Sequence, residues 1–130
     1  MKTIEIKILN NQFKETAEIK FDRKKRSLTL TMKNGLTKTC TGEDLYECFG
    51  MIRAYFPEII FLCKGARINV HPSRMTSQMS CGLVAYQVNT GYPTEEEDIV
   101  RIFDYEEENL TNDINEQRAF YSSWIKSLGP

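Results

Sequence analysis

The chain has 130 residues and a mass of 15.1 kDa, and 41% of its residues are apolar, so it can bury a core without disulfides and is neither disordered nor collagen-like. We expect one domain spanning residues 1–130. No apolar run is long enough to cross a bilayer, and the N-terminal residues lack the apolar block of a signal peptide, so we expect a cytoplasmic protein. The net charge is −1.

The first forty residues alternate apolar with polar side chains, and this period of two predicts an antiparallel meander. The dipeptide Asn34–Gly35 is typical of a type I′ hairpin turn, and residues 36–39 follow it as a fourth strand. The apolar positions of the first three strands are Ile4, Ile6 and Ile8, then Ala17, Ile19 and Phe21, then Leu28, Leu30 and Met32.

The period then changes to that of a helix, which we expect over residues 42–55. Thr41 offers a capping hydroxyl, and the two acidic residues that follow Gly42 suit a helix N-terminus. Pro57 prevents the helix from continuing. The apolar run 59–63 then predicts a strand buried on both faces.

The second half predicts shorter elements. Residues 66–82 show no clear period, although Ser73 suits the cap of one helical turn, and strands are expected over 83–88 and 99–103. Asp113–Glu116 resembles a capping box and predicts a last helix, ended by Gly129–Pro130. The buried face expected for that helix is Ile114, Tyr121, Trp124, Ile125 and Leu128.

Taken together, these elements predict an α+β fold with a mostly antiparallel sheet. An N-terminal meander would be followed by one central helix and by a C-terminal helix packed on the sheet.

Charge is distributed unevenly along the chain. Residues 1–40 hold ten basic and four acidic side chains, whereas residues 95–116 hold ten acidic side chains and one arginine. One interpretation is a solvated acidic loop. The other is an anionic face, at both ends of a short strand, that attracts a basic protein such as a nuclease. Its carboxylates would be Glu95, Glu96, Glu97, Asp98, Asp104, Glu106, Glu107 and Glu108.

Catalysis would have to use His71, the only histidine, with Cys63 or Cys81 as the nucleophile. A small Cys-His hydrolase is therefore an alternative, although no signature surrounds either thiol. The four cysteines lack CxxC spacing, so we expect free thiols.

Metal and cofactor sites have no support in the sequence. One histidine and scattered cysteines provide no zinc-ligand pair, and the glycines form no phosphate-binding motif, so we expect neither a metal nor a cofactor. The basic turn Arg23–Arg26 makes a nucleic-acid binder another alternative, but the acidic stretch would repel phosphate. We expect no nucleic acid and no membrane as partner.

Several short motifs occupy the last seventy residues: Cys63-Lys-Gly-Ala66, Pro72-Ser-Arg-Met75, Met79-Ser-Cys-Gly82 and Phe120-Tyr-Ser-Ser-Trp124. With them the chain resembles small bacterial proteins similar to the immunity proteins of polymorphic toxin and contact-dependent growth-inhibition systems. Cys81 stands where a small residue is more usual. The resemblance implies a cytoplasmic, non-enzymatic protein that binds a cognate toxin, a nuclease above all, and occludes its active site.

The motif residues allow two interpretations. In the first, the glycines permit tight turns, Met75, Met79 and Tyr86 fill gaps in the core, and Trp124 anchors the last helix. In the second, polar residues form a pocket or contact loop beside the acidic face. That second set is Arg67, Asn69, His71, Ser73 and Arg74, of which Arg67, His71 and Arg74 join the acidic residues as predicted partner-binding residues.

Overall fold

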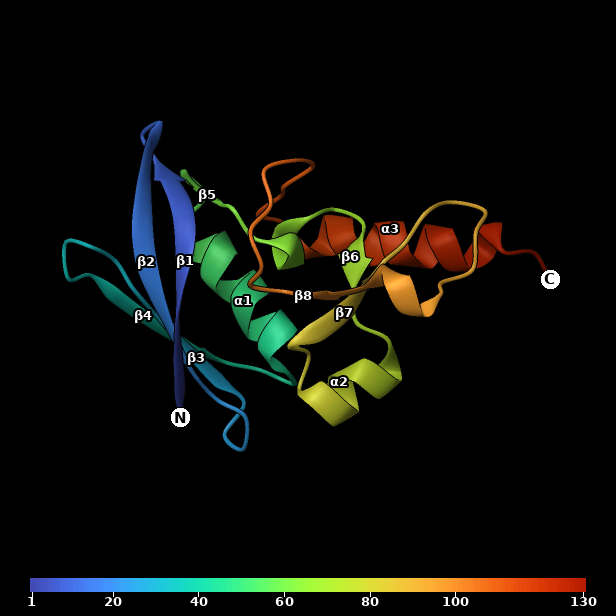
Figure 1. Ribbon diagram of the computed structural model, residues 1–130, viewed down its shortest axis with the longest axis horizontal. Coiled ribbons are helices and arrows are strands. Elements are labelled where there is room, and N and C mark those ends of the chain that lie inside the picture. The colour runs from blue at the N-terminus through green and yellow to red at the C-terminus, as the bar shows by residue number, and fades with distance from the viewer.

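The computed structural model describes residues 1–130 as two antiparallel sheets with three helices, which confirms the predicted α+β class (Figure 1). The five-stranded sheet has the order β4-β3-β2-β1-β5, and the three-stranded sheet has the order β6-β7-β8. The strands are β1 (Lys2–Asn10), β2 (Phe13–Asp22), β3 (Ser27–Thr31), β4 (Thr37–Thr41), β5 (Ile59–Phe61), β6 (Val70–His71), β7 (Val84–Gln87) and β8 (Ile99–Arg101). The helices are α1 (Leu45–Tyr55), α2 (Arg74–Ser80) and α3 (Ile114–Ser127), with single 3₁₀ turns η1 (Lys64–Ala66) and η2 (Glu96–Asp98).

The meander forms as the alternation predicts, with its apolar positions on the core side of the sheet. The type I′ turn predicted at Asn34–Gly35 is wrong. Only Gly35 adopts a positive φ there (+90°), and its N–H donates to the Met32 carbonyl at 2.9 Å, which makes a three-residue loop. Two consecutive positive φ angles occur instead at Asn11 (+53°) and Gln12 (+70°), in the turn between β1 and β2.

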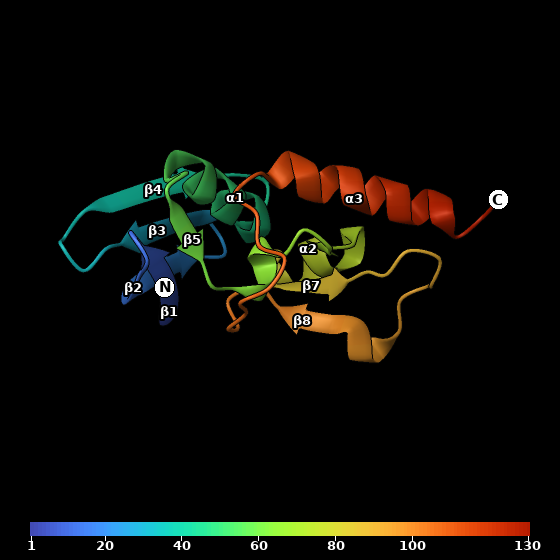
Figure 2. The ribbon, with the colours of Figure 1, turned by 90° about the horizontal axis from the view of Figure 1, so that it is seen from above.

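Helix α1 covers the core side of the five-stranded sheet (Figures 1 and 2). It starts three residues later than predicted, because Asp44 rather than Thr41 caps it, accepting the Glu47 N–H at 2.8 Å. Its last turn precedes Pro57. The side chains that it contributes to the main core are Leu45, Cys48, Phe49 and Ile52.

Two expectations about the middle of the chain are wrong. Strand β5 lies at the edge of its sheet, and Ile60 is 47% exposed, so the strand is buried on one face only. Met75 and Met79 are 57% and 74% exposed and fill no core gap, because α2 buries only its Thr76 side. The predicted cap of this helix is confirmed: Ser73 accepts the Thr76 N–H at 3.1 Å.

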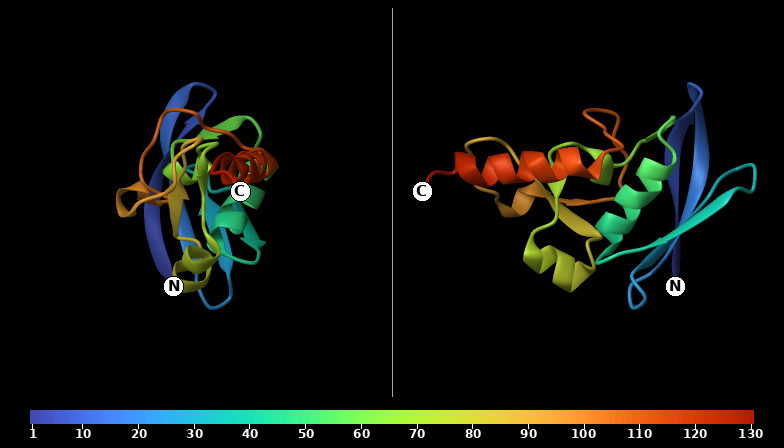
Figure 3. Two further views of the ribbon diagram at one scale, coloured as in Figure 1. Left: turned by 90° about the vertical axis from the view of Figure 1, so that its right-hand side faces the viewer. Right: turned by 180° about the vertical axis from the view of Figure 1, so that it is seen from behind.

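Helix α3 extends away from the five-stranded sheet, so that the N- and C-termini lie at opposite ends of the molecule (Figure 3). Asp113 caps it, but Glu116 accepts a hydrogen bond from the Thr111 hydroxyl at 2.8 Å, and the predicted capping box is absent. Ile125 and Leu128, expected to be buried, are 50% and 41% exposed.

The buried face of α3 consists of Gln117 and Trp124, and Gln117 forms a polar joint with α1. The wholly buried Arg53 of α1 donates to Gln117 at 2.5 Å and to the Thr111 carbonyl at 3.1 Å. Gln117 in turn donates to the carbonyls of Gly65 and Arg67 at 2.8 and 2.7 Å. Burial lowers the pKa of Arg53 to about 10, so this side chain stays charged at neutral pH.

None of the three helices combines the length and the apolar character that a membrane crossing needs.

Candidate functional site

The acidic residues 95–108 lie on both sides of strand β8. Glu95, Glu96 and Glu97 are exposed on and next to η2, which precedes the strand. The loop that follows the strand (Figure 1) carries Asp104, Glu107 and Glu108, all of which are exposed. The sequence places the two groups at the ends of one short strand, and the structure agrees. We use the name acidic surface for the exposed side chains Glu95, Glu96, Glu97, Asp104, Glu107 and Glu108.

The second part of the acidic surface is held on a fixed backbone, because residues 104–111 run beside residues 62–68. Four backbone hydrogen bonds join the two segments, with donor–acceptor distances between 2.8 and 3.2 Å. They run from Lys64 N–H to Asp104, from Glu106 N–H to Leu62, from Ile68 N–H to Asn109 and from Thr111 N–H to Ala66. Because the loop is already ordered, binding a partner would cost little further conformational entropy.

Glu106 points toward the protein and anchors this loop. Its carboxylate pairs with Arg67 at 2.8 Å and with Lys64 at 3.4 Å, and it accepts the N–H groups of Glu107 and Glu108 at 3.0 and 3.2 Å. Burial alone would raise the pKa of Glu106, but the Arg67 hydrogen bond and the two N–H groups outweigh it and lower the pKa to about 2. Glu106 and Arg67 therefore position the acidic surface rather than extend it.

The other acidic side chains divide into two kinds. Asp98 accepts the Glu95 N–H at 2.8 Å and so shapes the turn, and Glu107 accepts the Tyr105 hydroxyl at 2.9 Å. A second kind makes no hydrogen bond or ion pair within the protein and is available to a partner. These are Glu96, Glu97, Asp104 and Glu108.

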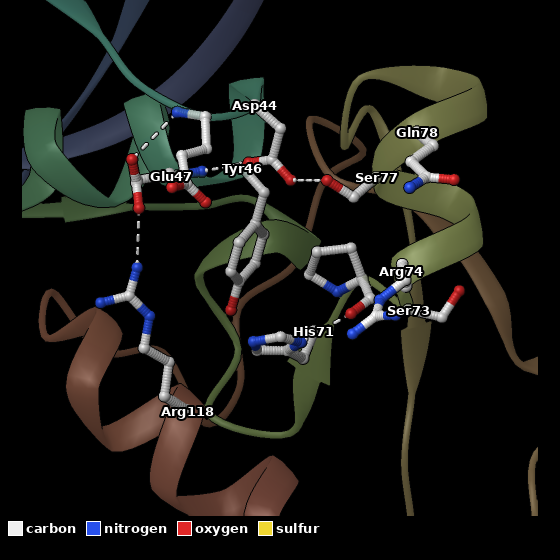
Figure 4. Close-up of a pocket in the computed structure, with 11 residues that line it drawn as sticks. Asp44, Tyr46, Glu47, His71, Ser73, Arg74, Ser77, Gln78 and Arg118 are labelled. Carbon is white, nitrogen blue, oxygen red and sulfur yellow. Dashed lines mark hydrogen bonds and ion pairs between the residues drawn. The ribbon is translucent and has the colours of Figure 1, made fainter.

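A separate polar pocket of about 360 Å³ lies where α1, α2, α3 and β6 meet (Figure 4). His71, Ser73 and Arg74 line it, as the second interpretation of the motif residues predicts. Arg67 and Asn69, expected in the same cluster, do not line it. Arg67 binds Glu106 instead, and the Asn69 amide donates to the Val88 carbonyl at 3.1 Å. The other lining residues are Glu43, Asp44, Tyr46, Glu47, Pro72, Ser77, Gln78 and Arg118.

Two carboxylates of the pocket are bonded by donors of the chain itself. Asp44 accepts the Ser77 hydroxyl at 2.5 Å in addition to the N–H that it caps. Glu47 accepts the Glu43 N–H at 3.0 Å and pairs with Arg118 of α3 at 2.9 Å. Figure 4 shows these contacts along the upper and left walls of the pocket. They tie α1 to both α2 and α3.

His71 forms part of the pocket floor. Its Nδ1 lies 2.7 Å from the Pro72 carbonyl, which assigns the proton of the neutral ring to Nδ1 and leaves Nε2 as an acceptor. The ring stacks on Tyr121, with the centroids 4.2 Å apart, and meets the edge of Tyr46. Burial lowers the pKa of His71, so the ring is neutral at pH 7. Arg74 nearby is exposed and has no partner within the protein.

No hydrogen bond joins a cysteine to His71. All four are free thiols. Cys63 is fully buried, and burial raises its pKa to about 12, while Cys81 is directed at the Arg23 carbonyl at 3.6 Å. Neither lines the pocket that holds His71. Nucleophilic catalysis needs the thiol within hydrogen-bond reach of its base.

The basic turn that motivates the nucleic-acid alternative is partly engaged with its own chain. Arg23 donates to the Met79 carbonyl at the end of α2 at 2.9 Å, and Arg26 reaches the Glu43 carbonyl at 3.5 Å. Two of the four basic side chains therefore hold the turn against neighbouring segments.

Sequence reasoning misses most of the polar pocket. Glu47 and Arg118 are 71 residues apart, and Asp44 and Ser77 are 33 apart, so no local spacing relates them. The one usable signal is Asp44 itself, because an aspartate before a helix is a common cap.

In comparisons with known proteins, no protein-family model and no curated protein matches this chain. The resemblance to immunity proteins therefore stays a prediction.

Proposed function

We propose that this chain is a cytoplasmic immunity protein that binds a basic toxin domain, most simply a nuclease, and covers its active site. The observation that carries the proposal is the acidic surface. It gathers exposed carboxylates at both ends of one short strand, and hydrogen bonds to residues 62–68 hold half of them on an ordered loop. The resemblance of the motifs to those of immunity proteins supports the same assignment.

The physical argument is electrostatic. A nuclease cleft must be positively charged to attract phosphate groups, and an anionic surface of similar extent can occupy it in place of the substrate. Charges of this kind act mainly on the rate and orientation of encounter, and their effect weakens as salt is added. His71 and Arg74 of the polar pocket would make a second, polar contact, whereas Arg67 would act through Glu106.

The test begins with the native host. A tagged chain is used to capture protein partners, which are identified by mass spectrometry, and the captured toxin domain is then used for surface plasmon resonance. The variant Glu96→Lys/Glu97→Lys reverses two exposed charges that have no role in the fold. Glu18→Lys/Glu58→Lys is the matched control, because it changes the net charge equally at exposed sites outside the acidic surface.

We expect the first variant to slow association by about tenfold at low ionic strength and much less at high salt, with the control close to the wild type. Equal rates for the two variants would show that net charge rather than the acidic surface matters. Failure to capture any protein, together with unchanged growth of host cells that lack the chain, would refute immunity. Loss of an enzymatic activity on His71→Ala would favour the hydrolase alternative.

A further inference from the structure

A groove of about 890 Å³ lies between the start of β1 and the three-stranded sheet. Its volume is within the range of about 300–1,000 Å³ that is usual for binding sites. None of Glu95, Glu96 and Glu97 lines the groove, so it is not an extension of the η2 part of the acidic surface. The apolar residues that line it are Met1, Ile4, Phe21, Leu83, Val84 and Phe103.

One wall of this groove is an unpaired strand edge. Strand β2 pairs with β1 from Lys2 to Asn10, but on the other side β5 pairs only with residues 8–10 (Figure 1). The last contact on that side is the bond from Leu62 N–H to the Lys7 carbonyl at 3.0 Å. The backbone groups of successive residues point to opposite sides of a strand, so Thr3 and Glu5 direct their N–H and C=O groups to the same open side as Lys7.

The groove reaches this open edge. Side chains two residues apart lie on the same face of a strand, so Lys2 and Ile4 share the core side of β1 with the buried Ile6 and Ile8. Glu5 lies on the opposite face. Lys2, Ile4 and Glu5 all line the groove. The backbone between them therefore borders the same space as the apolar floor.

Charged side chains of both signs line the groove, and four of them are basic: Lys2, Arg23, Lys24 and Arg101. Asp22 also lines it, but its carboxylate already accepts the N–H groups of Lys24 and Lys25. At the start of β1 the groove is lined by Lys2 and by Arg23 and Lys24, which follow the end of β2. Glu5 lies further along β1, and Asp104, whose carbonyl accepts the Lys64 N–H at 2.8 Å, lies toward the Lys7 end. An occupant would gain from an acidic group beside Lys2, Arg23 and Lys24.

We propose that an extended peptide segment of a protein partner binds in this groove as an added strand on β1. Its backbone would pair with Thr3 and Glu5, alternate side chains would enter the apolar floor, and the segment would carry an acidic residue at the Lys2 end. Strand addition of this kind takes its affinity from main-chain hydrogen bonds and its specificity from every second side chain. The inference holds whether or not that partner is a toxin.

The probe is a phage-displayed library of random peptides of about ten residues, the upper end of the range of strand lengths, selected against the full chain. Selected peptides should alternate apolar and polar residues. They should bind Thr3→Pro about tenfold more weakly, because proline removes an edge N–H, while the matched Thr3→Ala binds like the wild type. The Thr3 N–H takes no part in pairing with β2, so the sheet itself is preserved.

Hydrogen exchange on the wild-type protein gives a second readout that needs no variant. Peptide binding should slow exchange at the amides of Thr3 and Glu5, whereas the amide of Ile4, directed toward β2, should change little. The proposal is overturned if no peptide is enriched, if enriched peptides bind Thr3→Pro and the wild type equally, or if the protected amides lie outside β1.

Discussion

Replacing Glu106 by glutamine should destabilise the protein in a pH-dependent way. The substitution keeps the shape of the side chain but removes the charge that pairs with Arg67 and Lys64. A carboxyl whose pKa falls from 4.5 to about 2 on folding would add about 3 kcal/mol to the free energy of unfolding at neutral pH if it were fully shielded. Glu106 and Arg67 are 13% and 14% exposed, so solvent screening reduces the expected loss to about 1–2 kcal/mol.

The sign of the pH dependence follows from the lowered pKa. The stabilisation is complete above about pH 4.5 and is lost as the pH falls toward 2, because the folded state must then take up the same proton as the unfolded state. Urea unfolding at several pH values between 7 and 3 measures the difference between the wild type and Glu106→Gln. We expect the two curves to converge as the pH falls.

The control for this experiment is Glu108→Gln, which neutralises an exposed neighbour that has no side-chain partner. It should leave the free energy of unfolding within about 0.5 kcal/mol of the wild type. A difference between Glu106→Gln and the wild type that stays constant from pH 7 to pH 3 would refute the anchoring role of the ion pair.

Three further results are expected. Trp124→Phe should cost about 1 kcal/mol in urea unfolding, because it removes the 2.8 Å hydrogen bond to the Tyr92 carbonyl, and an unchanged midpoint would contradict this. Gly65→Ala should lower the free energy of unfolding by about 1–3 kcal/mol in thermal unfolding, because the added Cβ would lie 2.6 Å from the Ile102 side chain. An unchanged stability would mean that the backbone at Gly65 and Ile102 can move apart with little loss of free energy. The NMR titration of His71 should show a midpoint below 6.5, with stability lost as the pH falls below that value, and a midpoint above 6.5 would be inconsistent with its burial.

The parts of the fold that the sequence predicts are those set by neighbours in the chain. The alternation of apolar and polar side chains identifies β1 to β3, because one face of an antiparallel sheet is buried and the other is solvated. Ser73 and Asp113 identify two helix starts because a cap acts on N–H groups two or three residues away. The turn at Asn34–Gly35 is also determined by local residues. However, Asn-Gly fits both a two-residue type I′ turn and a three-residue hairpin loop, and the three-residue loop forms.

The remaining features depend on partners far away in the sequence. Ile125 fits the helical period as well as Gln117 does, yet the glutamine is buried, because Arg53, 64 residues earlier, and two carbonyls satisfy its amide. In the same way, Glu106 looks like any other member of an acidic run. Only the structure shows that it faces Arg67 and that its neighbours face solvent.

The polar joint between α1 and α3 has a consequence for synthesis of the chain. Arg53 leaves the ribosome well before Gln117, so its guanidinium must keep its water shell until the last helix arrives with the acceptor. Until then α1 cannot pack completely against the five-stranded sheet, and the apolar side of that sheet stays accessible to other nascent chains. Completion of the fold therefore depends on the arrival of α3, and a chain cut before α3 would leave the Arg53 guanidinium without its Gln117 acceptor.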